Sequence, residues 1–90
     1  MSYAQLQKDI PQLLSFSQKE IIEALQNEVT LQEQTVLRMW YGLETDQKSR
    51  EEISVFYGAT PKRIRAIWCS ARRKLEEWAA RKNSWRSTLL

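Results

Sequence analysis

The chain has 90 residues, of which 42% are hydrophobic and 28% are charged, so we expect one globular domain with a single core. It holds one cysteine and no histidine, which excludes an internal disulfide, zinc sites of the usual Cys/His type, and Ser/His/Asp or Cys/His catalysis. No apolar run approaches the roughly 20 residues that cross a bilayer, and charged residues interrupt the N-terminal segment. We therefore expect neither a membrane span nor a signal peptide, and a location in the cytoplasm.

Catalysis by paired carboxylates is not expected either. Glu51 and Glu52 are adjacent in sequence, as are Glu76 and Glu77. Neighbouring residues on a helix point in different directions, so neither pair forms a two-carboxylate site. The sequence predicts no enzyme activity, no metal and no cofactor.

The charge is distributed unevenly along the chain. Residues 1–60 hold five Lys/Arg against nine acids, whereas residues 61–90 hold nine Lys/Arg against two acids. A strongly basic last third indicates a surface for a polyanion near the C-terminal end. A solvated charged helix would give the same pattern, so charge alone leaves both interpretations open.

In chain order, the first expected element is a helix within residues 3–15, broken or begun near Pro11. Three capping boxes then predict helices near 18–28, 31–41 and 50–57, because a hydroxyl residue is followed three positions later by glutamate. These boxes are Ser17–Glu20, Thr30–Glu33 and Ser49–Glu52.

The last expected helix runs from Pro61 to about residue 82, since Thr60 precedes a proline at the first helical position. Gly42 and Gly58 are placed to end the preceding helices in a left-handed conformation, and residues 42–48 form a polar loop. No segment alternates with a period of two. The predicted fold is therefore all-α, a compact bundle of four to five helices.

Residues 49–73 have the pattern of a helix-turn-helix whose second, long helix is the recognition helix. Ile53 is an apolar anchor, Ser54 is small enough for the next helix to approach, and Gly58 suits a tight turn. Ile64 and Ile67 then hold the second helix against the core. A plain αα-hairpin in a helical bundle is the alternative.

A helical wheel of the last helix separates a core face from a polar face. The core face holds Ile64, Ile67, Trp68, Ala71, Leu75 and Trp78. The other side has small residues at its centre and cations around them, which suits insertion into a major groove between two phosphate walls. The predicted DNA-binding residues are Thr60, Lys62, Arg63, Arg65, Ala66, Cys69, Arg72, Arg73 and Lys74.

Residues 31–75 resemble region 4 of bacterial sigma-70-type initiation factors. The resemblance rests on VLRMWYGL (36–43), SREEIS (49–54), YGAT (57–60), KRIRAIW (62–68) and RKL (73–75). In that family, YGL is followed by a variable loop and then EEI, as it is here. The resemblance divides the single domain into a helical extension (1–30), a sigma-like part (31–75) and a C-terminal extension (76–90).

The resemblance implies that residues 60–73 enter the major groove of an upstream (−35) promoter element in double-stranded DNA. It also implies that Arg63 and Arg65 contact the DNA backbone, and that Glu52 lies near the DNA. The helices before residue 60 would receive the flap of the RNA polymerase β subunit. Such a protein would be found at the nucleoid.

Three positions depart from the family. Its base-contacting Arg-Glu pair falls at Pro61 and Lys62, and its Gln falls at Ala66. Lysine reverses the preference of a glutamate for a cytosine amino group, and alanine neither donates nor accepts a hydrogen bond. The usual −35 specificity is therefore not carried over. No segment resembles the family's region for opening the −10 element, so we expect a stand-alone region 4.

Two hypotheses about function remain open at this stage. The first is a DNA-binding transcription regulator that acts alone, as a homodimer or beside RNA polymerase. The second is a protein-interaction module that docks on the polymerase or on a sigma factor without sequence-specific DNA binding. The basic last third favours the first, and Pro61 and Ala66 favour the second.

The two ends of the chain fall outside the resemblance. One predicted apolar stripe holds Leu6, Ile10, Leu13 and Leu14, and another holds Trp78, Trp85, Leu89 and Leu90. The ends either pack together and extend the core or form a surface for a partner.

Overall fold

A computed structural model describes the backbone of residues 3–89 and the side chains of residues 3–84. Its elements are α1 (Tyr3–Asp9), the 3-10 helix η1 (Pro11–Leu13), α2 (Gln18–Asn27), α3 (Leu31–Tyr41), α4 (Arg50–Tyr57) and α5 (Pro61–Leu89). Residues 3–89 contain no strand. The predicted all-α class is confirmed, and the helix boundaries lie close to those expected except at the end of α5, which continues to Leu89.

The helix starts follow from the capping chemistry in the sequence. In α2, α3 and α4 the hydroxyl at the N-cap accepts from the backbone of the third helical residue, and the glutamate there accepts from the N-cap backbone. Two of the helices end as expected, because Gly42 (φ 66°) follows α3 and Gly58 (φ 62°) follows α4, both in the left-handed conformation. Each capping box satisfies two backbone donors that the helix itself leaves free.

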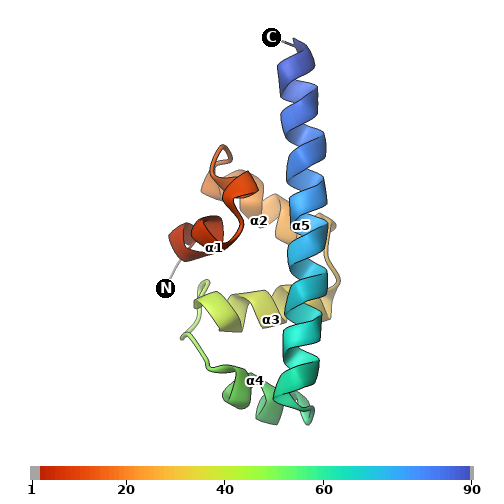
Figure 1. Cartoon of the computed structure of the whole chain (residues 1–90). Helices are drawn as coiled ribbons and strands as arrows, with labels where there is room; N and C mark the ends of the chain where they lie inside the picture. Colours follow the sequence, from red (N-terminus) through yellow and green to blue (C-terminus); the bar gives the residue numbers. More distant parts are fainter. Residues whose placement is uncertain (1–2, 90) are drawn as a thin grey trace.

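The other helices are arranged around α5, which runs the length of the molecule (Figure 1). α4 lies beside the start of α5, α3 crosses its lower half, and the N-terminal helices lie higher up. The far end of α5 projects beyond them, which gives extents of 47 × 21 × 19 Å. The first half of α5 is therefore held by α3 and α4, the two helices that precede it.

The core has two parts that meet at a pair of tryptophans. The smaller part joins α3 to the helix-turn-helix and consists of Val36, Ile53, Ile64 and Ile67. The larger part joins the N-terminal helices to the second half of α5 and consists of Leu6, Ile10, Leu13, Phe16, Ile21, Ala24, Leu25, Leu37, Tyr41, Leu43, Ala71, Leu75, Trp78 and Ala79. The rings of Trp40 and Trp68 stack at 5.1 Å and pack against both parts. The predicted core face of α5 is thus buried, with Trp68 half-buried.

Three of the four positions of the predicted N-terminal apolar stripe are buried. Leu6, Ile10 and Leu13 are buried, but Leu14 is 64% exposed. Leu14 follows η1, and Phe16, two residues further on, packs on Trp78 instead, with ring centroids 4.6 Å apart. The N-terminal helices and α5 therefore do pack together. The predicted stripe positions Trp85, Leu89 and Leu90 lie outside the described side chains.

Candidate nucleic-acid interface

The connection between α4 and α5 is a tight turn of the helix-turn-helix type. The backbone N–H groups of Gly58 and Ala59 both donate to the carbonyl of Ser54, the latter over 2.9 Å. Ser54 is buried, and its hydroxyl donates to the carbonyl of Glu51 at 2.7 Å. Thr60 then caps α5, since its hydroxyl accepts from the N–H of Arg63 at 3.1 Å. This turn fixes the direction in which α5 leaves α4.

Seven of the nine predicted DNA-binding residues lie on the exposed side of α5 or at its cap. These are Thr60, Lys62, Arg63, Arg65, Ala66, Cys69 and Arg73. The four cations among them form no ion pair with another described residue. These seven residues form one exposed surface, in which cations without an ion pair among the described residues surround Ala66 and Cys69. We call this surface the groove face.

Lys74 differs from those seven residues because it forms an ion pair within the protein. Its ammonium lies 2.8 Å from Glu33 Oε1, and the hydroxyl of Ser70 donates to Glu33 Oε2 at 2.7 Å. Burial raises the pKa of Glu33, but the hydrogen bonds from Lys74, Thr30 and Ser70 and the charge of Lys74 outweigh burial and lower the pKa from 4.5 to about 2. A phosphate contact by Lys74 would therefore have to compete with an ionised carboxylate.

Arg72 is also paired within the chain. Its Nε donates to Glu76 Oε2 at 3.2 Å, one helical turn later, and its guanidinium lies 5.4 Å from the centre of the Trp68 ring. The side chain is half-buried. Arg72 and Lys74 thus support the packing of α5, whereas the other four predicted cations face solvent.

A hydrogen-bond network that was not predicted from the sequence ties α1 to α5. The hydroxyl of Tyr41 donates to Asp9 Oδ2 at 2.7 Å and accepts from the indole N–H of Trp68 at 3.0 Å. Burial, followed by the hydrogen bond to Asp9, raises the pKa of Tyr41 well above its ordinary value. No local sequence motif predicts this network, because Tyr41 is 32 positions from Asp9 and 27 positions from Trp68.

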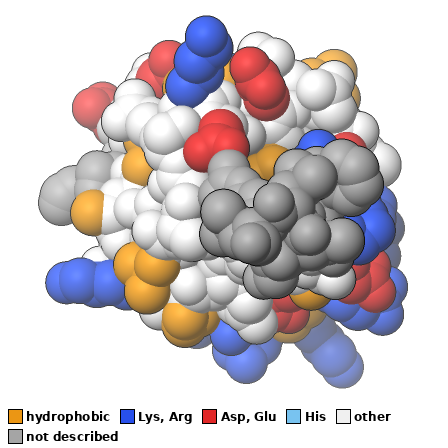
Figure 2. All heavy atoms as spheres, turned by 90° about the horizontal axis from the view of Figure 1, so that it is seen from above, with side chains coloured by type: hydrophobic (Ala, Val, Ile, Leu, Met, Phe, Trp, Pro, Cys, Tyr) orange, Lys and Arg blue, Asp and Glu red, His pale blue; other side chains and the backbone are white. Residues whose placement is uncertain are grey.

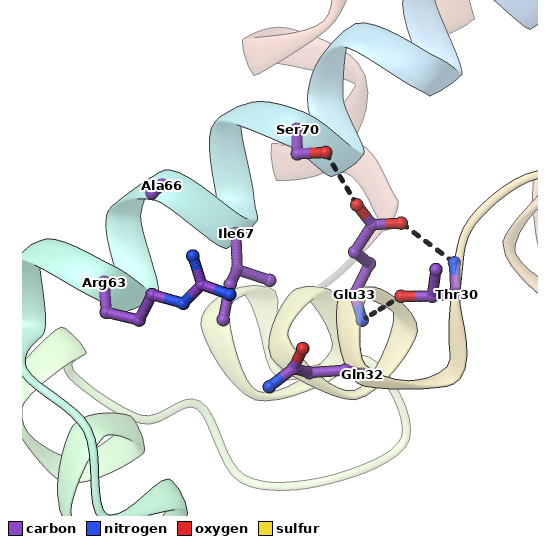
Figure 3. A pocket seen from close by; sticks show the side chains of 7 residues that line it. All are labelled: Thr30, Gln32, Glu33, Arg63, Ala66, Ile67 and Ser70. Atoms are coloured by element: carbon purple, nitrogen blue, oxygen red, sulfur yellow. Dashed lines mark hydrogen bonds between the residues drawn. The ribbon is translucent and has the colours of Figure 1, made fainter.

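Two hollows lie at the surface, one beside the first half of α5 and one between α3 and α4. One, of about 220 Å³, lies between the start of α3 and α5 and is lined by Thr30, Gln32, Glu33, Arg63, Ala66, Ile67 and Ser70 (Figure 3). The other, of about 430 Å³, is lined by Met39, Lys48, Glu52, Val55 and Phe56. Val55 is 81% exposed and Phe56 is 65% exposed, so the second hollow borders an uncovered apolar patch on α4.

The charged side chains are unevenly placed around the molecule. Figure 2 looks along α5 from its C-terminal end and shows several Lys and Arg side chains along the left, lower and right edges, whereas several acidic side chains gather toward the upper edge beside another basic one. Within the part of the chain that the structure describes, no group of three His, Cys, Asp or Glu could hold a metal ion. None of the helices described there is both long enough and apolar enough to cross a membrane.

Comparison of this chain with known protein families, with curated proteins and with solved structures finds no match.

Proposed function

We propose that this protein binds double-stranded DNA as a transcription regulator, with the first half of α5 in the major groove. The observation that carries the proposal is the groove face, where the exposed cations Lys62, Arg63, Arg65 and Arg73 have no acidic partner among the described residues. Unpaired cations on one side of a helix suit a polyanion. Such a protein would act at the nucleoid.

The shape of the groove face agrees with insertion into DNA. Ala66 and Cys69 are small and exposed at its centre, so the helix can approach base edges closely, while the longer cations reach the phosphates on each side. Residues 60–73 span about 20 Å at 1.5 Å per residue, which is longer than the roughly 12 Å width of the major groove and so is enough to cross it. Arg72 and Lys74 would join the interface only by exchanging Glu76 and Glu33 for phosphates.

The resemblance of residues 31–75 to sigma region 4 supports the same proposal. In that family the corresponding helix enters promoter DNA, and Arg63 and Arg65 match backbone-contacting positions. Both side chains are exposed here, as such contacts require. Lys62, which replaces an acidic residue of the family, is also exposed and suits a guanine acceptor.

The test compares two variants that each remove one exposed positive charge. We expect Arg65→Ala on the groove face to weaken binding to a fluorescent duplex, and Lys19→Ala on α2 to bind like the wild type. Equal effects would show that only net charge matters and would argue against a groove-face site. A genome-wide crosslinking map, made with and without RNA polymerase blocked, then separates autonomous DNA binding from recruitment by polymerase.

A second candidate function is docking on RNA polymerase or on a sigma factor, and the exposed apolar patch of Val55 and Phe56 favours it. For this function, Phe56→Asp should abolish capture of purified RNA polymerase, while Arg65→Ala leaves capture unchanged. The opposite pattern, with capture lost only in Arg65→Ala, would indicate contact through nucleic acid.

A further inference from the structure

The 220 Å³ hollow beside α5 contains a cation that lacks a partner although a carboxylate lines the same space. Arg63 is the single Lys or Arg among the residues that line this hollow, and it forms no ion pair with any described residue. Glu33 also lines the hollow, so the lack of an ion pair between the two needs a physical reason.

The reason is that the Glu33 carboxylate is fully engaged elsewhere. One oxygen accepts from the backbone N–H of Thr30 and from the ammonium of Lys74, each at 2.8 Å, and the other accepts from the hydroxyl of Ser70 at 2.7 Å. Figure 3 shows this carboxylate turned toward Ser70 and Thr30, while the side chains of Arg63 and Gln32 lie on the other side of the hollow. The charge of Glu33 is thus compensated by Lys74, and the guanidinium of Arg63 remains available.

Two donor groups therefore face the same unfilled space from different helices. The guanidinium of Arg63 comes from α5, and the exposed amide of Gln32 comes from α3. A planar guanidinium binds a phosphate group through two parallel hydrogen bonds, and a side-chain amide adds a neutral donor. Ala66 belongs both to the lining of the hollow and to the groove face, so the hollow opens at the edge of the proposed DNA-binding surface.

We propose that this hollow holds one phosphate group of the DNA backbone, bound by Arg63 and by the side-chain amide of Gln32. The inference rests on the proposed function and adds to it a contact from α3, outside the helix-turn-helix. A DNA strand that forms one wall of the major groove would pass the hollow next to Ala66. Gln32 then fixes the angle at which α5 enters the groove.

The test measures duplex affinity for Gln32→Glu, with Gln26→Glu as the matched control, because Gln26 is an equally exposed glutamine on α2. We expect Gln32→Glu to weaken duplex binding about tenfold or more, because the change replaces a hydrogen-bond donor to the phosphate by a carboxylate that repels it. Gln26→Glu should change the affinity by less than about twofold. Circular dichroism checks that the variants are folded.

Duplexes in which single phosphates are replaced by neutral methylphosphonates locate the contact. One position should weaken wild-type binding, and the same replacement should have little further effect in Arg63→Ala and a reduced effect in Gln32→Ala, where the Arg63 contact remains. If Gln32→Glu binds duplex as tightly as the wild type does, this inference is overturned while the proposed function stands. If the wild type binds no duplex at all, the proposed function itself fails.

A titration with inorganic phosphate distinguishes a phosphate group of DNA from free phosphate as the ligand of the hollow. Amide chemical shifts of Gln32 and Arg63 that respond to the duplex but not to millimolar inorganic phosphate support a DNA contact. A response to inorganic phosphate together with no response to duplex would identify a free phosphate as the ligand and overturn the assignment to DNA.

Discussion

Glu33 and Lys74 are joined across 41 positions of sequence by an ion pair of 2.8 Å. Glu33 also completes the capping box of α3 by accepting from the backbone N–H of Thr30 at 2.8 Å. One carboxylate therefore helps to set both the start of α3 and the position of α5. The pair removes Lys74 from the exposed cations and leaves the groove face with four unpaired charges on α5.

This ion pair predicts how stability responds to acid. The pKa of Glu33 is lowered from 4.5 in the unfolded chain to about 2 in the folded protein, so its contribution is complete above pH 4.5 and is lost as the pH falls toward 2. The difference corresponds to a contribution on the order of 3 kcal/mol. Glu33→Gln keeps a capping-box residue but removes the charge, so the variant should lose less stability across this window.

Urea unfolding at several pH values between 2 and 6 measures this difference. Glu23→Gln, at an exposed position on α2, is the control and should follow the wild type. An acid dependence in Glu33→Gln as steep as that of the wild type would show that other carboxylates account for it.

Tyr41→Phe should destabilise the protein by about 1–2 kcal/mol, because the change leaves the indole N–H of Trp68 without its acceptor and leaves Asp9 with the Gln5 amide as its remaining side-chain donor among the described residues. Tyr57→Phe is the matched control, since no hydrogen bond joins the Tyr57 hydroxyl to a described residue. Thermal unfolding of both variants provides the measurement. Because the pKa of Tyr41 is raised, the ionisation step that Tyr41→Phe removes from an alkaline absorbance titration should lie above the ordinary tyrosine range. Equal stability of the two variants would rule out a structural role for the network.

Substitutions of Gly58 should follow backbone preference rather than size. Gly58 has φ of +62°, and a Cβ there would meet nothing within 4 Å. Gly58→Asn should be tolerated best, Gly58→Ala should cost about 1 kcal/mol, and Gly58→Val should cost more because β-branched residues resist positive φ. Chemical denaturation ranks the three variants. A Val variant as stable as the Asn variant would mean that the turn does not require this conformation.

Lys62→Ala should change specificity more than affinity. Lys62 is exposed near the start of α5, and a lysine there suits the acceptors of guanine in the major groove. We expect the variant to lose about 1–3 kcal/mol of discrimination at one guanine-bearing position. Selection of binding sites from random duplexes by both proteins measures this loss. Identical selected sites would contradict a base contact by Lys62.

The local parts of the fold were predictable because their causes lie within a few residues. A hydroxyl and a glutamate three positions apart define each capping box, and a glycine marks the end of α3 and of α4. The end of α5 was not predictable in this way, because no glycine or proline follows Pro61 and the helix meets no stop signal before Leu89.

The groove face could be predicted only in part, because a helical wheel gives the direction of a side chain but not its partner. It correctly placed Arg63 and Arg65 at the surface. It could not show that Lys74 reaches back to Glu33, or that Gln32 lines a hollow beside Arg63, because these contacts join α3 to α5. Likewise, the apolar pattern of the N-terminal segment did not show that Phe16 packs on Trp78 while Leu14 is exposed.

DNA binding through phosphate contacts of the groove face is tested most directly by duplex affinity measured as a function of salt concentration. We predict that the wild type binds duplex at low salt and that log affinity falls linearly with log salt. Arg63→Ala and Arg65→Ala should each make that slope shallower by about one unit, while Lys19→Ala leaves it unchanged. No measurable binding of the wild type to any duplex at low salt would contradict the account.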